Sequence, residues 1–328
     1  MRHQILLDVD TGRDDALAIM FAVRHPDIDV RAITCVAGNT DLENVVGNTM
    51  KILDLVDAPP IPVALGARRP LIEPPRDASW IHGMHGLGDV ELPVSDRSAE
   101  PIHAVELMRQ CLLEAEEPLT IIALAPMTNL ALLLRMHPEV SDRIKRIIFM
   151  GGSATIGNAT PVAEFNFWHD PEAAHIVLTS GIPLTMYGWD ILWGMRTSAE
   201  QIAELCASPN PIRQTAGRLL GFKVNDPSTG SVVVYDAIGD AGALCVMVAP
   251  EAFTIERWPV QVVLSPGAAR GQTLVDRRDM SGEDAVHNPS GPIPVIDVVS
   301  AASESEVLAR FFDTLGRSEA RRFDAAAV

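Results

Sequence analysis

The chain has 328 residues, 47% of them hydrophobic, and carries a formal net charge of −17 at pH 7. This length and hydrophobic content allow a large buried core and exclude a disordered chain. The acidic balance argues against a nucleic-acid partner or an anionic membrane surface, because both need a basic face on the protein. A neutral or cationic small ligand, or a bound divalent cation, fits this charge better.

Neither a targeting segment nor a membrane span is predicted. No apolar signal region precedes Asp8, and the longest apolar stretch, 119–136, is interrupted by Pro126, Thr128 and Asn129. The four cysteines are scattered and lack the spacing of a zinc site. We therefore expect a cytoplasmic protein whose thiols are reduced and buried.

Strands and helices alternate along the first part of the chain. Predicted strands cover 5–9, 30–36, 61–64, 119–124, 146–150 and 184–187, and predicted helices cover 14–23, 42–56 and 128–136. Further strands are expected from about residue 254, with a last helix near 300–315. This alternation predicts an α/β fold with an open, mostly parallel, doubly wound sheet. Because no linker or repeat is evident, a single domain over residues 1–328 is expected.

Two long segments interrupt the alternation. Residues 66–99 are rich in proline, glycine and charge, and residues 151–170 begin Gly-Gly-Ser. Both follow predicted strands, and loops of this length in compact α/β domains are usually functional. Ligands in such folds bind at the carboxyl ends of the strands, so we expect the active site there.

An acidic run follows the first predicted strand. Asp8 and Asp10 are expected to share a face of that strand, and Asp14 and Asp15 begin the next helix. Two carboxylates about 4 Å apart repel by about 4 kcal/mol at an effective dielectric of 20. A helix N-terminus contributes only about half a positive charge. The run therefore predicts protonated acids or a cation, and oxygen ligands favour Ca²⁺ or Mg²⁺ over zinc.

Two enzyme families carry acids at a strand end in this way. The Asp8-Val9-Asp10-Thr11 segment comes near the Asp-x-Asp-x-Thr motif of haloacid dehalogenase-like Mg²⁺ phosphatases, in which Asp8 would be the nucleophile. Thr11, however, stands one position early, and the late phosphate-binding lysine with its acidic pair is not evident.

The segment from Asp10 to Asp15 resembles the Asp-x-x-x-Asp-Asp signature of the inosine–uridine nucleoside hydrolases. Further matches to that family follow in order: Gly38-Asn39, Met150-Gly151-Gly152, Asn158, Ala163-Glu164-Phe165-Asn166-Phe167, Asp170-Pro171-Glu172-Ala173-Ala174 and Val234-Tyr235-Asp236-Ala237. The last of these takes the place of the family's late His-Asp pair. The matches span residues 8 to about 240 and are highly specific together.

This resemblance implies Ca²⁺-dependent hydrolysis of the N-glycosidic bond of ribonucleosides, giving ribose and free base. The implied protein ligands of the ion are Asp10, Asp15, Asp236 and the backbone carbonyl of Leu124. A ribose cis-diol would complete the coordination shell, and Asp10 would take a proton from the attacking water. The transition state would be oxocarbenium-like, as in glycoside hydrolysis. The implied substrate-binding residues are Asp14, Asn39, His82, Met150, Asn158, Glu164, Phe165, Asn166 and Trp189.

The sequence differs from the family pattern at the end of the site that would hold the leaving base. Tyr235 stands where the family commonly places a histidine, and a phenol with a pKa near 10 is a poorer proton donor at neutral pH than an imidazolium. His82 aligns with a family histidine that lines the base pocket. We count Tyr235 and His82, with Asp10, Asp14 and Asn39, as candidate catalytic residues.

Aromatic side chains are candidates for the apolar wall against which the base stacks. Trp189 is the best placed because it follows a strand; the others are Phe165, Phe167 and Trp168. His85 and His169 are expected at the surface.

The resemblance also bears on the assembly, the biological role and the activity of the protein. The resemblance implies a homodimer or homotetramer and a role in nucleoside salvage, without identifying the preferred base. Because Tyr235 replaces the expected acid, a non-catalytic nucleoside-binding protein is an alternative. Residues 225–231 are expected to form part of a lid.

Overall fold

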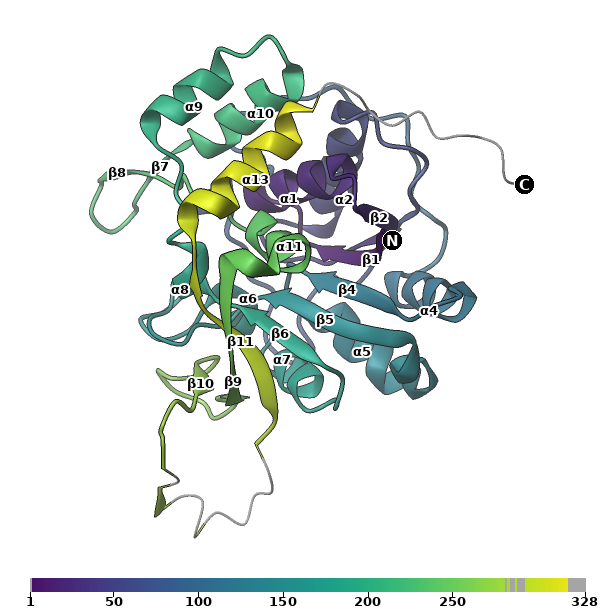
Figure 1. Cartoon of the computed structure of the whole chain (residues 1–328), viewed down its shortest axis with the longest axis vertical. Coiled ribbons are helices and arrows are strands. Elements are labelled where there is room, and N and C mark those ends of the chain that lie inside the picture. Colours follow the sequence, from purple (N-terminus) through teal and green to yellow (C-terminus); the bar gives the residue numbers. More distant parts are fainter. Residues whose placement is uncertain (1, 281, 284–286, 288–292, 318–328) are drawn as a thin grey trace.

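The computed structural model describes residues 2–280, 282–283, 287 and 293–317. The described residues form a nine-stranded sheet with the order β10-β9-β11-β6-β5-β4-β1-β2-β3 (Figure 1). The strands from β3 to β11 in this order run parallel, whereas β9 is antiparallel to both β11 and β10. Their bounds are β1 (His3–Val9), β2 (Ile28–Cys35), β3 (Val63–Leu65), β4 (Leu119–Ala123), β5 (Ile144–Met150), β6 (Leu184–Tyr187), β9 (Phe253–Val262), β10 (Thr273–Val275) and β11 (Val295–Ala302). The predicted open, mostly parallel α/β sheet is confirmed.

Helices connect the parallel strands, as parallel pairing requires. Their bounds are α1 (Arg13–Arg24), α2 (Leu42–Leu55), α3 (Ser79–His82), α4 (Ala104–Glu114), α5 (Thr128–Met136), α6 (Phe165–His169), α7 (Pro171–Leu178), α8 (Trp189–Leu192), α9 (Ala199–Cys206), α10 (Pro211–Leu220), α11 (Ala241–Val248) and α13 (Glu304–Gly316), with short 3₁₀ turns η1 (Pro138–Arg143) and η2 (Pro250–Ala252). A separate hairpin pairs β7 (Lys223–Asn225) with β8 (Val232–Val234). Its turn covers most of the segment that was predicted to belong to a lid.

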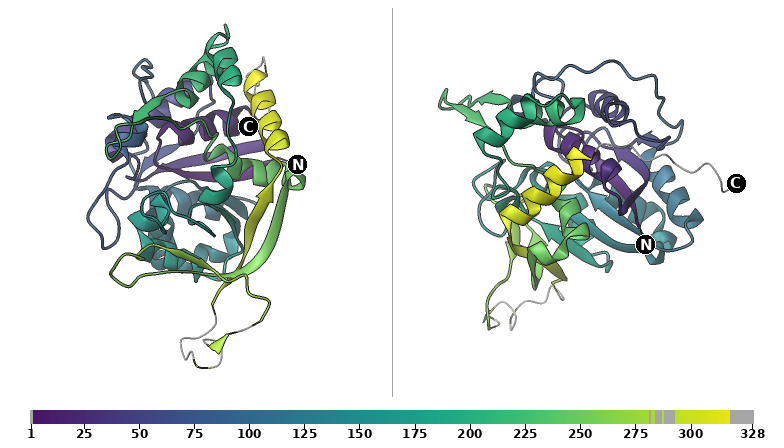
Figure 2. Two further views of the ribbon diagram at one scale, coloured as in Figure 1. Left: turned by 90° about the vertical axis from the view of Figure 1, so that its left-hand side faces the viewer. Right: turned by 45° about the horizontal axis from the view of Figure 1, so that its top comes forward.

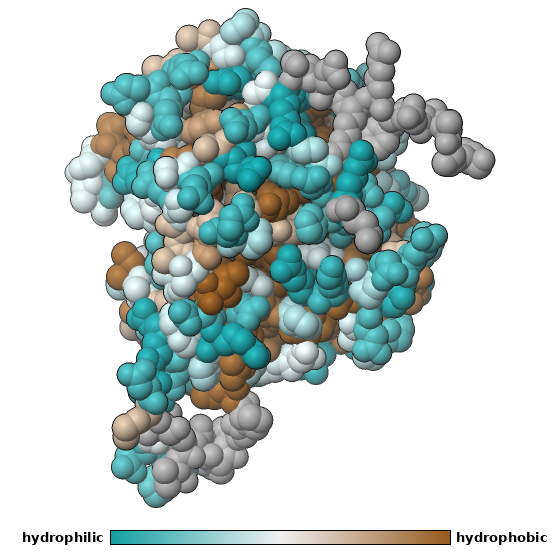
Figure 3. Space-filling view, viewed as in Figure 1, coloured by the Kyte–Doolittle hydropathy of each residue, from teal (hydrophilic) through white to brown (hydrophobic). Residues whose placement is uncertain are grey.

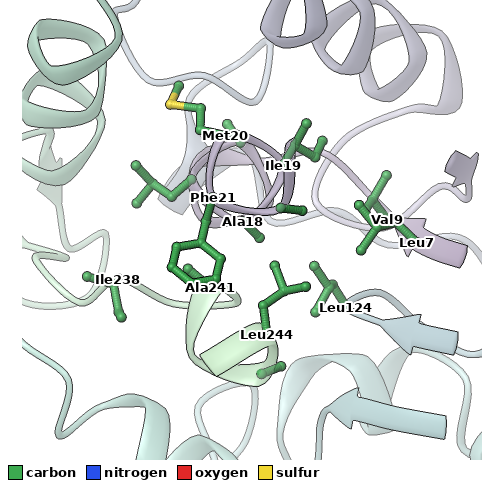
Figure 4. Close-up of a cluster of buried hydrophobic side chains, with 14 of the residues drawn as sticks. Leu7, Val9, Ala18, Ile19, Met20, Phe21, Leu124, Ile238, Ala241 and Leu244 are labelled. Carbon is green, nitrogen blue, oxygen red and sulfur yellow. The ribbon is translucent and has the colours of Figure 1, made fainter. Parts of the chain in front are cut away.

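Both faces of the sheet are covered, because side chains alternate along each strand. Leu7 of β1 belongs to the core cluster formed with α1, α2, α11 and α13, whereas Leu6 belongs to the cluster formed with α4, α5 and α7. Figure 4 shows the first cluster, with Phe21 of α1 pointing toward Ala241 of α11. This packing places the start of α11 beside α1. It therefore sets where acidic side chains from the starts of these two helices meet.

The last helix begins later than its prediction near residue 300. Residues 295–302 form β11, which pairs with both β6 and β9. The β-branched side chains of this segment therefore belong to a strand and not to the last helix. The helix α13 then starts at Glu304 and packs against α1 and α10, as the two views of Figure 2 show.

The face of the molecule in Figure 3 is mostly hydrophilic, and hydrophobic residues show there in scattered patches. Within the residues that the structure covers, no helix has the length and apolar character needed to cross a membrane. Cys35 and Cys245 are buried, Cys111 and Cys206 are partly buried, and all four thiols are free.

Candidate active site

A cavity of about 220 Å³ lies among the loops that follow the carboxyl ends of the parallel strands. This volume suits one small molecule rather than a polymer. Most of the residues predicted from the sequence line it: Asp14, Asn39, His82, Leu124, Met150, Asn158, Glu164, Phe165, Asn166, Trp189 and Tyr235. Asp10, Asp15 and Asp236 do not belong to its lining.

Three acids meet at one end of the cavity. Asp14, Asp15 and Asp240 each present a carboxylate oxygen, and these oxygens lie within 4.8 Å of one another. Asp14 and Asp15 stand in the first turn of α1, and Asp240 immediately precedes α11, which packs against α1. Burial, with the nearby charge of Asp14, raises the pKa of Asp15 to about 7. The same two causes raise the pKa of Asp240 well above its ordinary value.

Asp10 lies beside this cluster and is held by its neighbours. Its Oδ2 accepts a hydrogen bond of 2.7 Å from the backbone of Asn39, while its Oδ1 is buried and has no hydrogen-bond partner among the described residues. Burial, followed by the charge of Asp15, raises the pKa of Asp10. The side-chain amide of Asn39 also donates to Asp15 at 3.0 Å, so one asparagine fixes both acids.

The donor set fits a hard divalent cation. Asp10 and Asp14 each keep a buried Oδ1 without a hydrogen-bond partner within the described part of the chain. Buried carboxylates that face one another without cations are costly unless they are protonated or coordinate a metal. All of these donors are oxygens, which suits Ca²⁺ or Mg²⁺ better than zinc.

The structure corrects the late acid of the predicted ligand set. Asp236 accepts two hydrogen bonds from the guanidinium of Arg196, at 2.7 and 3.1 Å, and lies outside the acid cluster. Asp240 meets Asp14 and Asp15 instead, because a turn at Gly239, with φ of +57°, leads directly into α11. The sequence signal that could have found Asp240 is an acid directly before an apolar helical run.

The structure also changes the role of Asp8. Its Oδ1 accepts hydrogen bonds from Thr34 at 2.7 Å and from Asn129 at 2.9 Å, and the side chain is fully buried. These contacts tie β1 to β2 and to α5. Asp8 does not line the cavity, so it cannot act there as the nucleophile of a phosphatase.

The loop after β5 forms the wall next to the acids. Glu164 caps α6 by accepting hydrogen bonds from the backbone of Asn166 at 2.9 Å and of Phe167 at 3.2 Å. Burial raises the pKa of Glu164 to about 7. The amide of Asn166 donates to the carbonyls of Leu124 and Met150, at 3.0 and 3.1 Å. These bonds tie the loop to the ends of β4 and β5.

Asn158 braces the same loop, because its Oδ1 accepts a hydrogen bond of 2.8 Å from the backbone of Phe165. Both residues line the cavity. The loop is therefore ordered by its own polar side chains.

Two further predicted residues, His82 and Tyr235, line the cavity, and Nδ1 of His82 lies 3.7 Å from Oδ1 of Asp14. The Nδ1 of His82 accepts a hydrogen bond of 3.2 Å from the backbone of Arg13, which leaves the proton of the neutral ring on Nε2. Burial lowers the pKa of His82 to about 4, so the ring is neutral at pH 7. Burial raises the pKa of Tyr235, which therefore stays a phenol.

Aromatic rings also line the cavity. Trp189 stacks on Trp193 with ring centroids 5.1 Å apart, and Trp193 meets Tyr235 edge-on at 5.2 Å. Trp168 and Phe165 also line the cavity. Phe167 does not, because it is fully buried in the core and stacks on Phe149.

Other residues of the cavity lining were missed in the sequence, among them Arg13, Trp193 and Asp240. Arg13 lies within the acidic motif, between Asp10 and Asp14. The prediction that His169 lies at the surface is wrong, because α6 turns its ring into the interior and only 1% of it is exposed. His85 is exposed, as predicted.

Comparison with known proteins agrees with this geometry. Residues 5–304 match the family model described as inosine-uridine preferring nucleoside hydrolase. The chain is 40% identical over 288 residues to a pyrimidine-specific ribonucleoside hydrolase, RihA, of Shewanella oneidensis, covering 87% of this chain and 90% of that one.

Solved structures show the same fold. A plant nucleoside hydrolase, PpNRh1, superposes with a TM-score of 0.87 at 27% identity, covering 96% of this chain and 99% of that chain. A purine-preferring ribonucleoside hydrolase from Gardnerella vaginalis superposes with a TM-score of 0.80 at 29% identity, covering 95% and 98%. These matches exclude the haloacid dehalogenase-like alternative. The chain belongs to the inosine-uridine preferring nucleoside hydrolase family and is an enzyme that hydrolyses the N-glycosidic bond of ribonucleosides.

Proposed function

We propose that the protein hydrolyses pyrimidine ribonucleosides to ribose and free base at a Ca²⁺ site formed by Asp10, Asp15, Asp240 and the backbone carbonyl of Leu124. The observation that carries this proposal is the convergence of the Asp14, Asp15 and Asp240 oxygens within 4.8 Å at one end of a cavity. Asp236, the ligand expected from the sequence, is replaced by Asp240.

The roles of Asp14 and Asp15 follow from where they point. Both contribute to the acid cluster, but only Asp14 also lines the cavity, so Asp15 is assigned to the ion and Asp14 to the ribose hydroxyls. When bound, Ca²⁺ lowers the pKa of a water molecule and accepts the two hydroxyls of a cis-diol.

Asp10 is assigned as the base. Its Oδ2 is held by the backbone of Asn39, and its Oδ1 has no partner among the described residues. A carboxylate fixed by one oxygen and free at the other can accept a proton without reorienting. Burial raises its pKa, which increases its affinity for that proton.

The polar side chains of the ribose end would stabilise the positive charge that develops on the sugar. Asp14 and Glu164 are acids there, and Asn39 and Asn158 add amide dipoles. Asn166 uses its amide hydrogens on two backbone carbonyls, so its carbonyl oxygen is the atom left for a ribose hydroxyl. Met150 and Phe165 would contribute apolar contacts.

The base is assigned to the aromatic side chains of the lining. Trp189 and Tyr235 offer ring faces and edges, and the Nε2–H of His82 is a hydrogen-bond donor. The relative at 40% identity is named pyrimidine-specific, whereas the purine-preferring solved structure is 29% identical. The higher identity favours uridine and cytidine as substrates.

Initial rates of ribose release from uridine, cytidine, inosine and adenosine test the proposal, with 2′-deoxyuridine as the control substrate. Uridine and cytidine are expected to react fastest, and 2′-deoxyuridine is expected to react poorly because it lacks the cis-diol. Asp10→Asn is expected to lower kcat by roughly 10²–10⁴-fold, the usual effect of removing a general base. Normal turnover by this variant contradicts the assignment of Asp10, and tight uridine binding without turnover by the natural protein would favour a binding protein.

A further inference from the structure

One basic side chain lines the cavity together with its acids. Asp14, Glu164 and Asp240 belong to the lining, and so do His82, Tyr235 and Arg13, whose charge interacts with both Tyr235 and Asp14. Arg13 is the one lysine or arginine among the described residues that line the cavity. It is also 4% exposed, so its charge lies in a largely water-free environment.

Arg13 is held in place by three contacts. Its Nη1 donates a hydrogen bond of 2.9 Å to the carbonyl of Leu219, and its guanidinium carbon lies 5.1 Å from the centre of the Phe222 ring. A Cβ on Gly88 would come within 3.3 Å of the Arg13 Cδ, so the loop between α3 and α4 closes over the stem. Its Nε is buried without a hydrogen-bond partner within the described chain. The guanidinium is thus oriented in advance, and among the described residues Asp14 is the acid whose charge acts on it.

Neither His82 nor Tyr235 is an acid suited to donating a proton at neutral pH. Gly239, the residue before Asp240, has no side chain and packs against Asp14, where a Cβ would come within 2.2 Å. His82 is neutral at pH 7, with its Nδ1 occupied by a backbone N–H. Tyr235 is a phenol whose pKa is raised further by burial. A departing base would therefore lie near the fixed positive charge of Arg13, and neither His82 nor Tyr235 would readily donate a proton to it.

We propose that Arg13 is a catalytic residue that donates hydrogen bonds to the carbonyl oxygen of the departing base and stabilises the negative charge on it. This rests on the proposed function. The bond between C1′ and the base nitrogen breaks, and its electron pair goes to the base. Water adds to C1′ and gives a proton to Asp10, and the base anion takes a proton from solvent after release. A positive group beside the base and carboxylates beside the sugar would match the separated charges of this transition state.

The class of substrate follows from the donor. A guanidinium is a planar fork of N–H groups that suits an oxygen next to a ring nitrogen. Pyrimidine ribonucleosides carry such a carbonyl beside the glycosidic nitrogen.

A leaving-group comparison tests the proposal. Uridine loses a base of high pKa, whereas 4-nitrophenyl β-D-ribofuranoside loses a phenolate that needs little stabilisation. Arg13→Gln keeps a donor for the Leu219 carbonyl but removes the charge, and it is expected to lower kcat on uridine by about 100-fold, the scale of losing one electrostatic contact to the transition state. On the nitrophenyl riboside the expected loss is less than about fivefold, because that leaving group is already stable.

Arg218→Gln is the matched control. Arg218 is on the same helix end as Leu219, is exposed, and donates to the carbonyl of Asp89 rather than lining the cavity. It is expected to leave both rates unchanged. Arg13→Lys keeps the charge without the fork, and it should lose less activity on uridine than Arg13→Gln.

The outcomes separate the two proposals. Equal losses on both substrates in Arg13→Gln would show that the residue only holds the loops together, and no loss on uridine would show that it has no role. If Arg13→Gln does not fold, Arg13→Lys replaces it: a greater loss on uridine than on the nitrophenyl riboside supports the proposal, and equal losses overturn it. A natural protein that releases no ribose from any nucleoside contradicts the proposed function itself.

Discussion

Asp236 and Asp240 are four positions apart in the sequence but have different partners in the fold. Asp236 is neutralised by the bidentate contact with Arg196, whereas Asp240 faces Asp14 and Asp15. A carboxylate whose two oxygens already accept hydrogen bonds from arginine is a poor ligand for a cation. At the scale of single residues, the partner of a carboxylate therefore decides its chemistry.

Asp240→Asn and Asp236→Asn form a matched pair that tests this reading. Asp240→Asn is expected to lower both Ca²⁺ affinity, measured by calorimetry, and kcat on uridine by roughly 100-fold or more, because a charged oxygen ligand is lost. Asp236→Asn should stay within about threefold of the natural protein, since it removes only a partly exposed ion pair. The opposite ranking would restore Asp236 as the ligand.

At the scale of elements, the site depends on how α11 begins. The turn at Gly239 has φ of +57°, in the left-handed region that favours glycine. The same residue packs against Asp14, so no side chain fits there. The helix α11 can thus start close to α1, and Asp240 reaches the acid cluster.

Gly239→Ala is expected to destabilise the protein by about 1–3 kcal/mol through backbone strain and to weaken Ca²⁺ binding by displacing the adjacent Asp240. Gly230→Ala is the control: φ is +69° there, but a Cβ would meet nothing within 4 Å. This control is expected to cost only about 1 kcal/mol and to keep its Ca²⁺ affinity. Urea unfolding and calorimetry measure the two effects. Equal Ca²⁺ affinity in both variants would contradict the role assigned to the turn at Gly239.

At the scale of the whole molecule, the buried acids oppose folding. Asp10, Asp15, Asp240 and Glu164 all have raised pKa values, with burial as the largest cause. A ligand that binds only the folded state stabilises it by an amount set by its concentration relative to Kd. A cation that neutralises these acids should therefore raise the stability of the whole fold.

Ca²⁺ at one hundred times its Kd is expected to raise the free energy of unfolding by about 2.7 kcal/mol, and chelation should reverse this. Thermal unfolding with Ca²⁺, with Mg²⁺ and with a chelator measures the effect. No shift in Tm with Ca²⁺ would contradict the cation site. In Asp240→Asn the shift is expected to be much smaller than in the natural protein.

His169 makes the stability of the fold depend on pH. Burial lowers the pKa of its ring to about 4, and neither ring nitrogen has a hydrogen-bond partner among the described residues. The unfolded chain, with a histidine pKa near 6.5, binds the proton more readily. The stability contributed by the neutral buried ring is therefore full above about pH 6.5 and is lost as the pH falls toward 4.

His169→Leu is expected to lose less stability than the natural protein between pH 7 and pH 5, by roughly 2 kcal/mol. Urea unfolding of both proteins at several pH values measures this difference, and other groups that titrate are shared by both. Parallel pH profiles would show that His169 is not the responsible group.

Three expectations about the molecule as a whole stay predictions. These are the single domain over residues 1–328, the assembly into homodimers or homotetramers, and the location in the cytoplasm. Sedimentation of the purified protein measures the second.

Elements whose pattern is local could be predicted closely. The strand at 184–187 and the helix at 128–136 agree with β6 and α5, because alternating and helical spacings of apolar residues act within each segment. Asn39, Glu164 and Asn166 could be found because they stand in ordered motifs directly after strands. The strand β11 was harder to predict from the sequence, because its pairing with β6 and β9 depends on residues far along the chain.

The sequence by itself determined the fold class, the family, and an acid-rich site at the strand ends, because periodicity and contiguous motifs are local properties. Only the tertiary structure decided which acids meet. It moved Asp8 away into hydrogen bonds with Thr34 and Asn129, paired Asp236 with Arg196, and brought Asp240 beside Asp15. The reason is physical: the packing of α11 on α1 sets the distances between carboxylates that are more than 200 residues apart in the sequence, and no local pattern encodes those distances.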